Sequence, residues 1–213
     1  MKRLRGNALR SPFNAEAGRE TLLQGRELLR QRYYENNNGT ALLRDHCRLV
    51  DSLLREVWHG IAMPDSISLL AVGGYGRGQL FPYSDIDLLV LLPKVRNGVD
   101  AMDNAIKSRL ELWVRLLWDI GLEVGHSVRT LAECAEEAIK DITVQTSLLE
   151  ARQLAGDSQL FSGFSHAMQA ALDPRSFFIA KQLEQQQRHG RYHDVTYNLE
   201  PNLKESPGGL RDL

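Results

Sequence analysis

The feature that most constrains the fold of this chain is a glycine-rich turn followed, after an eleven-residue spacer, by a strand-like run, within residues 72–92 (VGGYGRGQLFPYSDIDLLVLL). The apolar run Ile86–Leu92 has the length of a strand and predicts a buried one. Two carboxylates, Asp85 and Asp87, stand at its beginning. Because successive side chains on a strand point to opposite faces, both carboxylates share one side, while Ile86 points into the protein.

This pair of carboxylates predicts a divalent-cation site. Two like charges at this separation repel each other unless a cation lies between them. Hard oxygen ligands beside a glycine turn suit Mg²⁺ that also holds the phosphates of a nucleotide. The sequence therefore predicts Mg²⁺ held by Asp85 and Asp87, and a chemistry of phosphoryl or nucleotidyl transfer. The alternative is an ordinary turn followed by two solvated aspartates.

The glycines before the strand predict a turn that receives phosphate. Glycine lets backbone N–H groups approach a phosphate closely and adopts positive φ without strain. Two polar neighbours add to this, since Arg77 offers a guanidinium fork and Ser84 a hydroxyl beside the first aspartate. We expect Gly73, Gly74, Arg77 and Ser84 to bind substrate. The stretch is not a Walker loop, because no G-x-x-x-x-G-K-[ST] is present.

Hydrophobic periodicity predicts helices and further strands around this unit. Helices are expected over residues 16–34, 40–60, 100–120, 131–140, 158–171 and 176–190, and strands over 66–72, 122–129, 148–154 and 195–199. A helix is expected in the first half of residues 142–154. Thr130 and Glu133 predict a capping box at the start of the fourth helix. The first two helices predict an antiparallel pair packed ahead of the core.

Composition excludes several classes of protein. A net charge of -1 gives no bulk attraction to nucleic acid, so we expect no nucleic-acid partner. No apolar run approaches the roughly 20 residues that span a membrane. The two cysteines, Cys47 and Cys134, have no metal-ligand spacing and predict no disulfide framework. These features predict a cytoplasmic protein.

Three stretches resemble one protein family. GGYGRGQLFPYSDIDLLVL, GLEVGHSVRT and NLEPNLKESPGGLRDL are similar to the bacterial PII uridylyltransferases, also called uridylyl-removing enzymes, over about residues 15–213. The resemblance implies Mg²⁺-dependent transfer of UMP from UTP to a tyrosine of the PII nitrogen-regulatory protein, with release of pyrophosphate. It also implies an HD-type domain that removes UMP and C-terminal domains that sense glutamine. Nothing in these 213 residues resembles either of them.

The same resemblance implies the architecture. We expect an α/β (α+β) fold with a DNA polymerase β-like nucleotidyltransferase core, a mixed sheet and a preceding helical pair. Residues 1–62 are expected to form an N-terminal helical region, and residues 63–213 the nucleotidyltransferase domain. Because GGLRD at residues 208–212 reads as a helix beginning, we expect a piece of a longer polypeptide.

Members of the nucleotidyltransferase superfamily usually have a third carboxylate on a later strand. The candidates here are Glu123, Asp141, Glu150 and Asp157. We prefer Glu150, which stands in an apolar, strand-like context two residues before Arg152. Many relatives have aspartate there, and the extra methylene leaves open whether this glutamate is a metal ligand or a base. The alternative is a structural glutamate paired with Arg152.

The other two stretches contribute candidates of lower specificity. His126 is expected to contact the nucleotide or a metal-binding carboxylate, or else to order the strand as a hydrogen-bonded histidine. Arg129 is a candidate phosphate contact, or else a partner of Glu123. Lys204 is a candidate triphosphate contact, or else part of a solvated loop.

The motif specifies the reaction and not the base. An enzyme that uses another nucleoside triphosphate or acceptor, such as an adenylyltransferase, therefore stays open beside the uridylyltransferase. A nucleotide-binding regulatory module without catalysis also stays open, although two adjacent like charges have no purpose in such a module. A nucleotidyltransferase acting on RNA is disfavoured by the net charge of -1.

Overall fold

The structure, a computed structural model, describes residues 13–94, 103–191 and 202–212. The helices are α1 Ala15–Asn36, α2 Gly39–Gly60, α3 Gly73–Gly76, α4 Asn104–Ile120, α5 Leu131–Lys140, α6 Ile142–Leu149, α7 Ser158–Ala170, α8 Pro174–Arg191 and the 3-10 helix Leu210–Asp212. The strands are β1 Ser68–Ala71, β2 Ile86–Leu92, β3 Val124–Thr130 and β4 Arg152–Gly156.

The four strands form one mixed sheet in the order β3-β2-β1-β4. β1 pairs antiparallel with β2 and β4, whereas β2 pairs parallel with β3. The central strand β2 is buried along its whole length except at Asp87. A mixed sheet preceded by a helical pair is the architecture that the sequence predicted.

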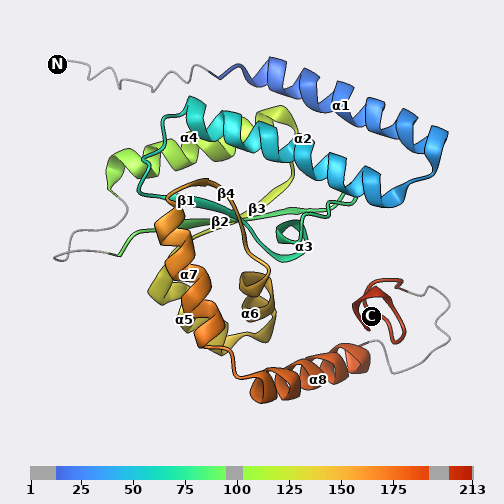
Figure 1. The fold of residues 1–213 in the computed structure, drawn as a ribbon, viewed down its shortest axis with the longest axis vertical. Coiled ribbons are helices and arrows are strands. Elements are labelled where there is room, and N and C mark those ends of the chain that lie inside the picture. The colour runs from blue at the N-terminus through green and yellow to red at the C-terminus, as the bar shows by residue number, and fades with distance from the viewer. Residues whose placement is uncertain (1–12, 95–102, 192–201, 213) are drawn as a thin grey trace, which may run out of the picture.

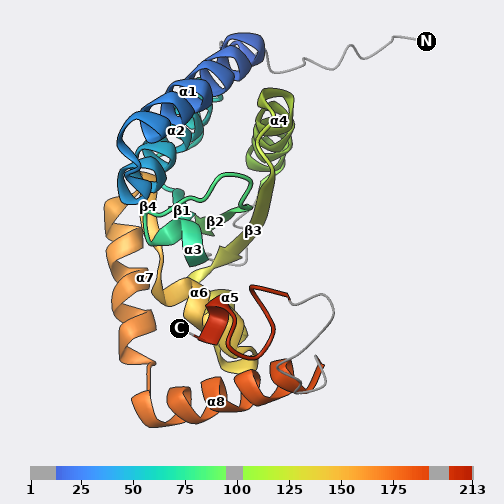
Figure 2. The same cartoon turned by 90° about the vertical axis from the view of Figure 1, so that its right-hand side faces the viewer.

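Helices cover both faces of the sheet, so that the molecule has three layers (Figure 1 and Figure 2). One core cluster joins alternate β2 residues, such as Ile86 and Leu88, to the apolar faces of α1, α2 and α4. The other joins Leu89 and Leu91 to α5, α6 and α7. This division follows from the two-residue period of a strand, which sends neighbouring side chains to opposite layers.

Local signals account for most of the element boundaries. The Thr130 side chain accepts from the Glu133 N–H and the Glu133 carboxylate accepts from the Thr130 N–H, which confirms the predicted capping box. α4 begins at Asn104 with Asp103 as its N-cap, later than predicted, and it ends at Ile120, where Gly121 in the left-handed conformation is the C-cap. The strand predicted at 195–199 lies outside the described residues.

None of the helices in the described ranges is both long enough and apolar enough to cross a lipid bilayer. The two cysteines are buried and free.

Candidate active site

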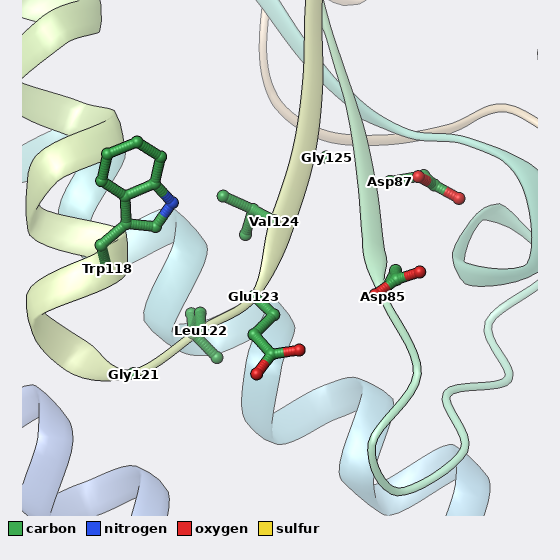
Figure 3. Close-up of a pocket in the computed structure, with 8 residues that line it drawn as sticks. All are labelled: Asp85, Asp87, Trp118, Gly121, Leu122, Glu123, Val124 and Gly125. Carbon is green, nitrogen blue, oxygen red and sulfur yellow. The ribbon is translucent and has the colours of Figure 1, made fainter.

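Asp85 and Asp87 lie at the first end of β2 and point to the same side of the strand (Figure 3). The alternating residues Ile86 and Leu88 are 2% exposed and belong to the opposite core layer. The carboxylates therefore lie at the end of the sheet where the central strand β2 begins, and the side chains that alternate with them are packed in the core. This is the placement that the two-residue period predicted.

The surroundings of Asp87 are crowded by backbone. A Cβ atom on Gly125, its partner on β3, would lie 3.0 Å from the Asp87 Oδ1, and a Cβ on Gly73 would lie 3.5 Å from the Oδ2. Burial, together with the charge of Asp85, raises the pKa of the Asp87 carboxyl, and the charge of Lys204 works against this rise. An added cation would relieve the same repulsion.

The glycine-rich stretch forms the single helical turn α3 rather than an open loop. Gly73 opens it with a φ of 57°, in the left-handed region that favours glycine. A Cβ on Gly76 would lie 2.1 Å from the carbonyl oxygen of Glu150. The Val72 N–H donates to the Asp87 carbonyl at 3.0 Å, so the turn begins directly beside the second aspartate.

The apolar context of Glu150 had suggested that it lies on a strand, but it does not. It is the C-cap of α6, two residues before β4 begins. Its carboxylate accepts from Arg77 at 2.7 Å, so the two predicted site residues pair with each other. The expected alternative partner, Arg152, instead pairs with Asp51 of α2 at 2.7 Å. The spacing of an acid two residues before an arginine therefore does not reflect a contact between them, since Glu150 pairs with Arg77 and Arg152 with Asp51.

Two residues near the turn were missed by sequence reasoning. A Cβ on Gly73 would lie 3.2 Å from the Ser147 Oγ, which places this α6 hydroxyl beside the first glycine and Asp87. Asp51 accepts a hydrogen bond from the buried hydroxyl of Tyr75, within α3, at 2.5 Å. Burial, together with the charge of Asp51, raises the pKa of that tyrosine. Neither residue carries a sequence pattern that marks it, because both reach the turn from distant helices.

An open cavity of about 540 Å³ adjoins the aspartates. It is lined by Asp85, Asp87, Trp118, Gly121, Leu122, Glu123, Val124 and Gly125 (Figure 3). Glu123 stands one residue before the paired part of β3, and its carbonyl accepts from the Ile86 N–H at 3.1 Å. Glu123 lies two residues before Gly125, the partner of Asp87, and residues two apart in an extended segment share a face. Glu123 is therefore directed to the face that carries the aspartates.

The donor set suits Mg²⁺ held jointly with a triphosphate. Within residues 13–94, 103–191 and 202–212, no three or more His, Cys, Asp or Glu side chains come together as a metal site. Asp85 and Asp87 share one side of β2 and line the cavity, so these two carboxylates could hold such an ion. Mg²⁺ commonly takes one or two carboxylates and completes its shell with phosphate oxygens and water.

The remaining predicted residues lie at different distances from the aspartates. Ser84 is exposed in the loop directly before Asp85. The positive charge of Lys204 acts to lower the pKa of Asp87. His126 follows Gly125 and so faces the other layer, where its ring meets the Trp113 ring edge to face at 6.5 Å. This placement fits the structural alternative for the histidine.

Arg129 is not brought next to the aspartates. It pairs in register with Leu91, four residues beyond the Asp87–Gly125 pair. Four residues of a strand span about 13 Å. No ion pair between Arg129 and Glu123 is found among the described residues.

Two family profiles match this chain. The profile described as a nucleotidyltransferase domain matches residues 54–148, which include the glycine turn and both aspartates. The profile described as GlnD PII-uridylyltransferase matches residues 176–213. The first match confirms the predicted nucleotidyltransferase core, which the mixed sheet already indicated.

Curated proteins described as bifunctional uridylyltransferase/uridylyl-removing enzymes are similar to this chain. The chain is 67% identical over 202 residues to the bifunctional uridylyltransferase/uridylyl-removing enzyme of Nitrosospira multiformis, a match that covers 95% of this chain and 23% of that protein. It is 56% identical to the protein so described from Bordetella avium, over 81% of this chain and 19% of the relative. It is 52% identical to that of Burkholderia vietnamiensis, over 87% and 21%. The chain spans about a fifth of the length of these relatives.

Among solved structures, similarity is weaker. A crystal structure of a toxin-antitoxin MntA-HpeT mutant matches 69% of this chain and 98% of its own, with 18% identity and a TM-score of 0.36. A crystal structure of a toxin-antitoxin with AMP-PNP matches with 20% identity and a TM-score of 0.35, over the same shares of the two chains.

Proposed function

We propose that this chain, which belongs to the family of bifunctional uridylyltransferase/uridylyl-removing enzymes and represents their nucleotidyltransferase portion, transfers UMP from UTP to a tyrosine of the PII protein. The observation that carries this proposal is the 67% identity over 95% of the chain. The same-side aspartates beside the glycine turn support the reaction type. Removal of UMP and sensing of glutamine are proposed for other parts of the longer proteins.

The substrate is positioned by the turn and the charges around it. The first N–H groups of a helical turn have no partner within the helix, so those of Gly73 and Gly74 are suited to phosphate oxygens. Arg77, Ser84 and Lys204 are the further polar contacts that we propose for the triphosphate. Asp85 and Asp87 would hold Mg²⁺, which supplies neutralisation of the phosphate charge when bound. His126 and Arg129 are proposed as more distant contributors, through the order and charge of β3.

The reaction needs one proton acceptor. The tyrosine oxygen of the acceptor protein bonds to the α-phosphorus, the bond from that phosphorus to the β-bridging oxygen breaks, and pyrophosphate leaves with its electron pair. A carboxylate takes the phenolic proton. Glu150, preferred from the sequence, is already paired with Arg77 at 2.7 Å, so one of its carboxylate oxygens is occupied by that guanidinium group. Glu123 lines the cavity with both aspartates, so we propose Glu123 as the acceptor and Glu150 as a residue that acts through Arg77.

Two matched variants distinguish these acids. Glu123→Gln should lower kcat about 100-fold, the usual effect of losing a general base. Glu150→Gln should raise the KM for UTP and leave kcat within a few fold. Turnover assays with saturating PII and a varied concentration of UTP measure both constants. A large loss of kcat in Glu150→Gln alone would return the catalytic role to Glu150.

The function itself is tested by labelling. The chain is incubated with Mg²⁺, PII and either UTP or ATP labelled at the α-phosphate, and transfer to PII is measured. We expect label from UTP alone, and none with Asp85→Asn or Asp87→Asn variants that keep the circular dichroism of the wild type. Label from ATP would favour an adenylyltransferase. Binding of UTP without any labelled product would favour a regulatory module.

Two organisational features complete the proposal. Residues 1–62 are proposed as a helical region attached to a nucleotidyltransferase domain of residues 63–213. A cytoplasmic location is proposed because the two cysteines, Cys47 and Cys134, are buried and free, as is usual in a reducing compartment.

A further inference from the structure

We propose that Asp51 and Arg152 are positioning residues for nucleotide binding, which fix the glycine turn α3 from the N-terminal helical pair. This inference rests on the proposed function, since it assumes that α3 receives the triphosphate. It assigns a role in the site to α2, which supplies none of the residues predicted from the sequence.

One guanidinium group connects the helix to the turn. The Arg152 Nη1 donates to the Asp51 Oδ2 at 2.7 Å, and its Nη2 donates to the Oδ1 at 3.1 Å. The remaining donors reach the backbone of α3: Nη2 lies 3.4 Å from the Tyr75 carbonyl oxygen, and Nε lies 3.3 Å from that of Gly76. Five donors in a rigid fork make this possible for arginine and not for lysine.

The tyrosine of the turn completes the connection. The Tyr75 hydroxyl donates to the same Asp51 carboxylate, and its ring lies beneath the Arg152 guanidinium, 5.4 Å from the ring centroid. Tyr75 is 2% exposed. Both the side chain and the carbonyl oxygen of this residue are therefore held, which leaves the turn little freedom to rotate.

The contacts between Asp51, Arg152 and α3 fix the position of the turn more than they stabilise the fold. The Asp51 side chain is 8% exposed and that of Arg152 30%, so both charges have lost much of their hydration. A buried ion pair gains little net stability over well-packed apolar residues of the same volume. Apolar replacements would also leave the carbonyl oxygens of α3 without these donors. Fixing the position of the turn is the role that this arrangement serves and a hydrophobic contact does not.

Displacement of the turn would act directly on the site. α3 begins beside Asp87, through the Val72 hydrogen bond to the Asp87 carbonyl and the close approach of Gly73 to its carboxylate. A shift of α3 therefore changes the spacing between the phosphate-binding amides and the two metal-binding carboxylates. Misplacements of about 1 Å in such sites cost up to 100-fold in rate or affinity.

The chain offers a matched pair of substitutions. Arg152→Lys keeps a positive charge next to Asp51 and removes the donors to α3. Arg55→Lys makes the same change in a second arginine beside this carboxylate, because the Arg55 Nη2 lies 3.5 Å from the Asp51 Oδ2 and its Nε donates to the Leu154 carbonyl. Among the described residues, no hydrogen bond or ion pair joins Arg55 to α3. Both variants are compared with wild type for the Kd of Mg²⁺–UTP by calorimetry, the KM for PII, and the melting temperature.

We expect Arg152→Lys to raise the Kd for UTP about tenfold or more, with the KM for PII unchanged. Arg55→Lys should leave both constants at their wild-type values. Equal Kd values in wild type and Arg152→Lys, or equal increases in the two lysine variants, would overturn the inference. A merely structural role would lower the melting temperature without this selective loss of UTP affinity.

A second variant and a binding measurement without PII allow for misfolding of Arg152→Lys and for failure of the proposed function. If Arg152→Lys fails to fold, Tyr75→Phe takes its place, since it removes one hydroxyl and keeps the ring; an unchanged Kd in that variant rejects the proposal. Calorimetry needs no acceptor protein, so a wild-type chain that binds UTP but labels no PII would refute the proposed function and leave the comparison of variants valid. A wild-type chain that binds no UTP overturns both.

Discussion

Replacing Asp87 with asparagine should stabilise the metal-free protein at neutral pH while abolishing nucleotide transfer. Two residues on a strand separate the two charges by about 6.6 Å. At that distance they repel by about 0.6 kcal/mol in bulk water and about 2.5 kcal/mol at the effective dielectric constant near a protein surface. Because both side chains reach solvent, we expect about 1 kcal/mol after screening by salt, or about 2–4 °C in melting temperature for a chain of this size.

The pH dependence has a definite sign. The pKa of Asp87 in the folded protein is raised above its usual 3.8, by burial and then by Asp85. The folded state therefore holds this proton more tightly than the unfolded state, and the stability gained from protonation is lost as pH rises through the folded pKa. Asparagine does not ionise, so the advantage of the variant should be present at pH 7 and should disappear as pH falls towards 3.8.

Urea denaturation in EDTA at pH 4 and pH 7 measures this difference, with Asp65→Asn as a control in an exposed turn. Excess Mg²⁺ should then stabilise the wild type by mass action and leave Asp87→Asn unchanged. The reasoning would be refuted by a variant that is no more stable than the wild type at pH 7 in EDTA. Equal stabilisation of both proteins by Mg²⁺ would refute the assignment of the metal ligand.

Two further substitutions test the turn and the cation near it. Gly76→Ala should destabilise the protein by about 2–3 kcal/mol in urea denaturation, because its Cβ would lie 2.1 Å from a backbone oxygen, whereas Gly163→Ala, in open space on α7, should stabilise it by up to about 1 kcal/mol. Similar values for the two alanine variants would contradict the packing seen at α3. Lys204→Met should raise the Kd for Mg²⁺–UTP about tenfold, since a hydrogen bond to a charged group contributes about 1.5 kcal/mol. Calorimetry against Lys107→Met, near the start of α4, checks this, and equal Kd values would remove Lys204 from the site.

Local patterns predicted much of the fold. The strand Ile86–Leu92 has the bounds that its apolar run indicated, and the helix after Thr130 begins where the capping box placed it. The common side of Asp85 and Asp87 also followed from the period of a strand alone. These features depend on neighbours within a few residues, which is why the sequence displays them directly.

Contacts between distant segments were not predictable in the same way. The run around Glu150 is apolar whether it is a strand or the end of a helix, and only packing of α6 against α3 decides the matter. The alternative pairing of Glu150 with Arg152 is not formed: Arg152 pairs with Asp51, which is 101 residues away and which no local pattern relates to it. The proximity of Glu123 to the aspartates likewise depends on the parallel register of β3 with β2.

The hydrogen bonds that hold α3 also have a consequence for biosynthesis. The bond from Arg152 to the Gly76 carbonyl spans 76 residues, and that to Asp51 spans 101. At about 5–20 residues per second, the glycines leave the ribosome roughly 4–15 s before the arginine that secures them. A nascent chain therefore passes through a period in which the turn of the proposed nucleotide site lacks the arginine that holds it. Binding of UTP, the proposed substrate, should strengthen only after β4 and then Lys204 have been translated.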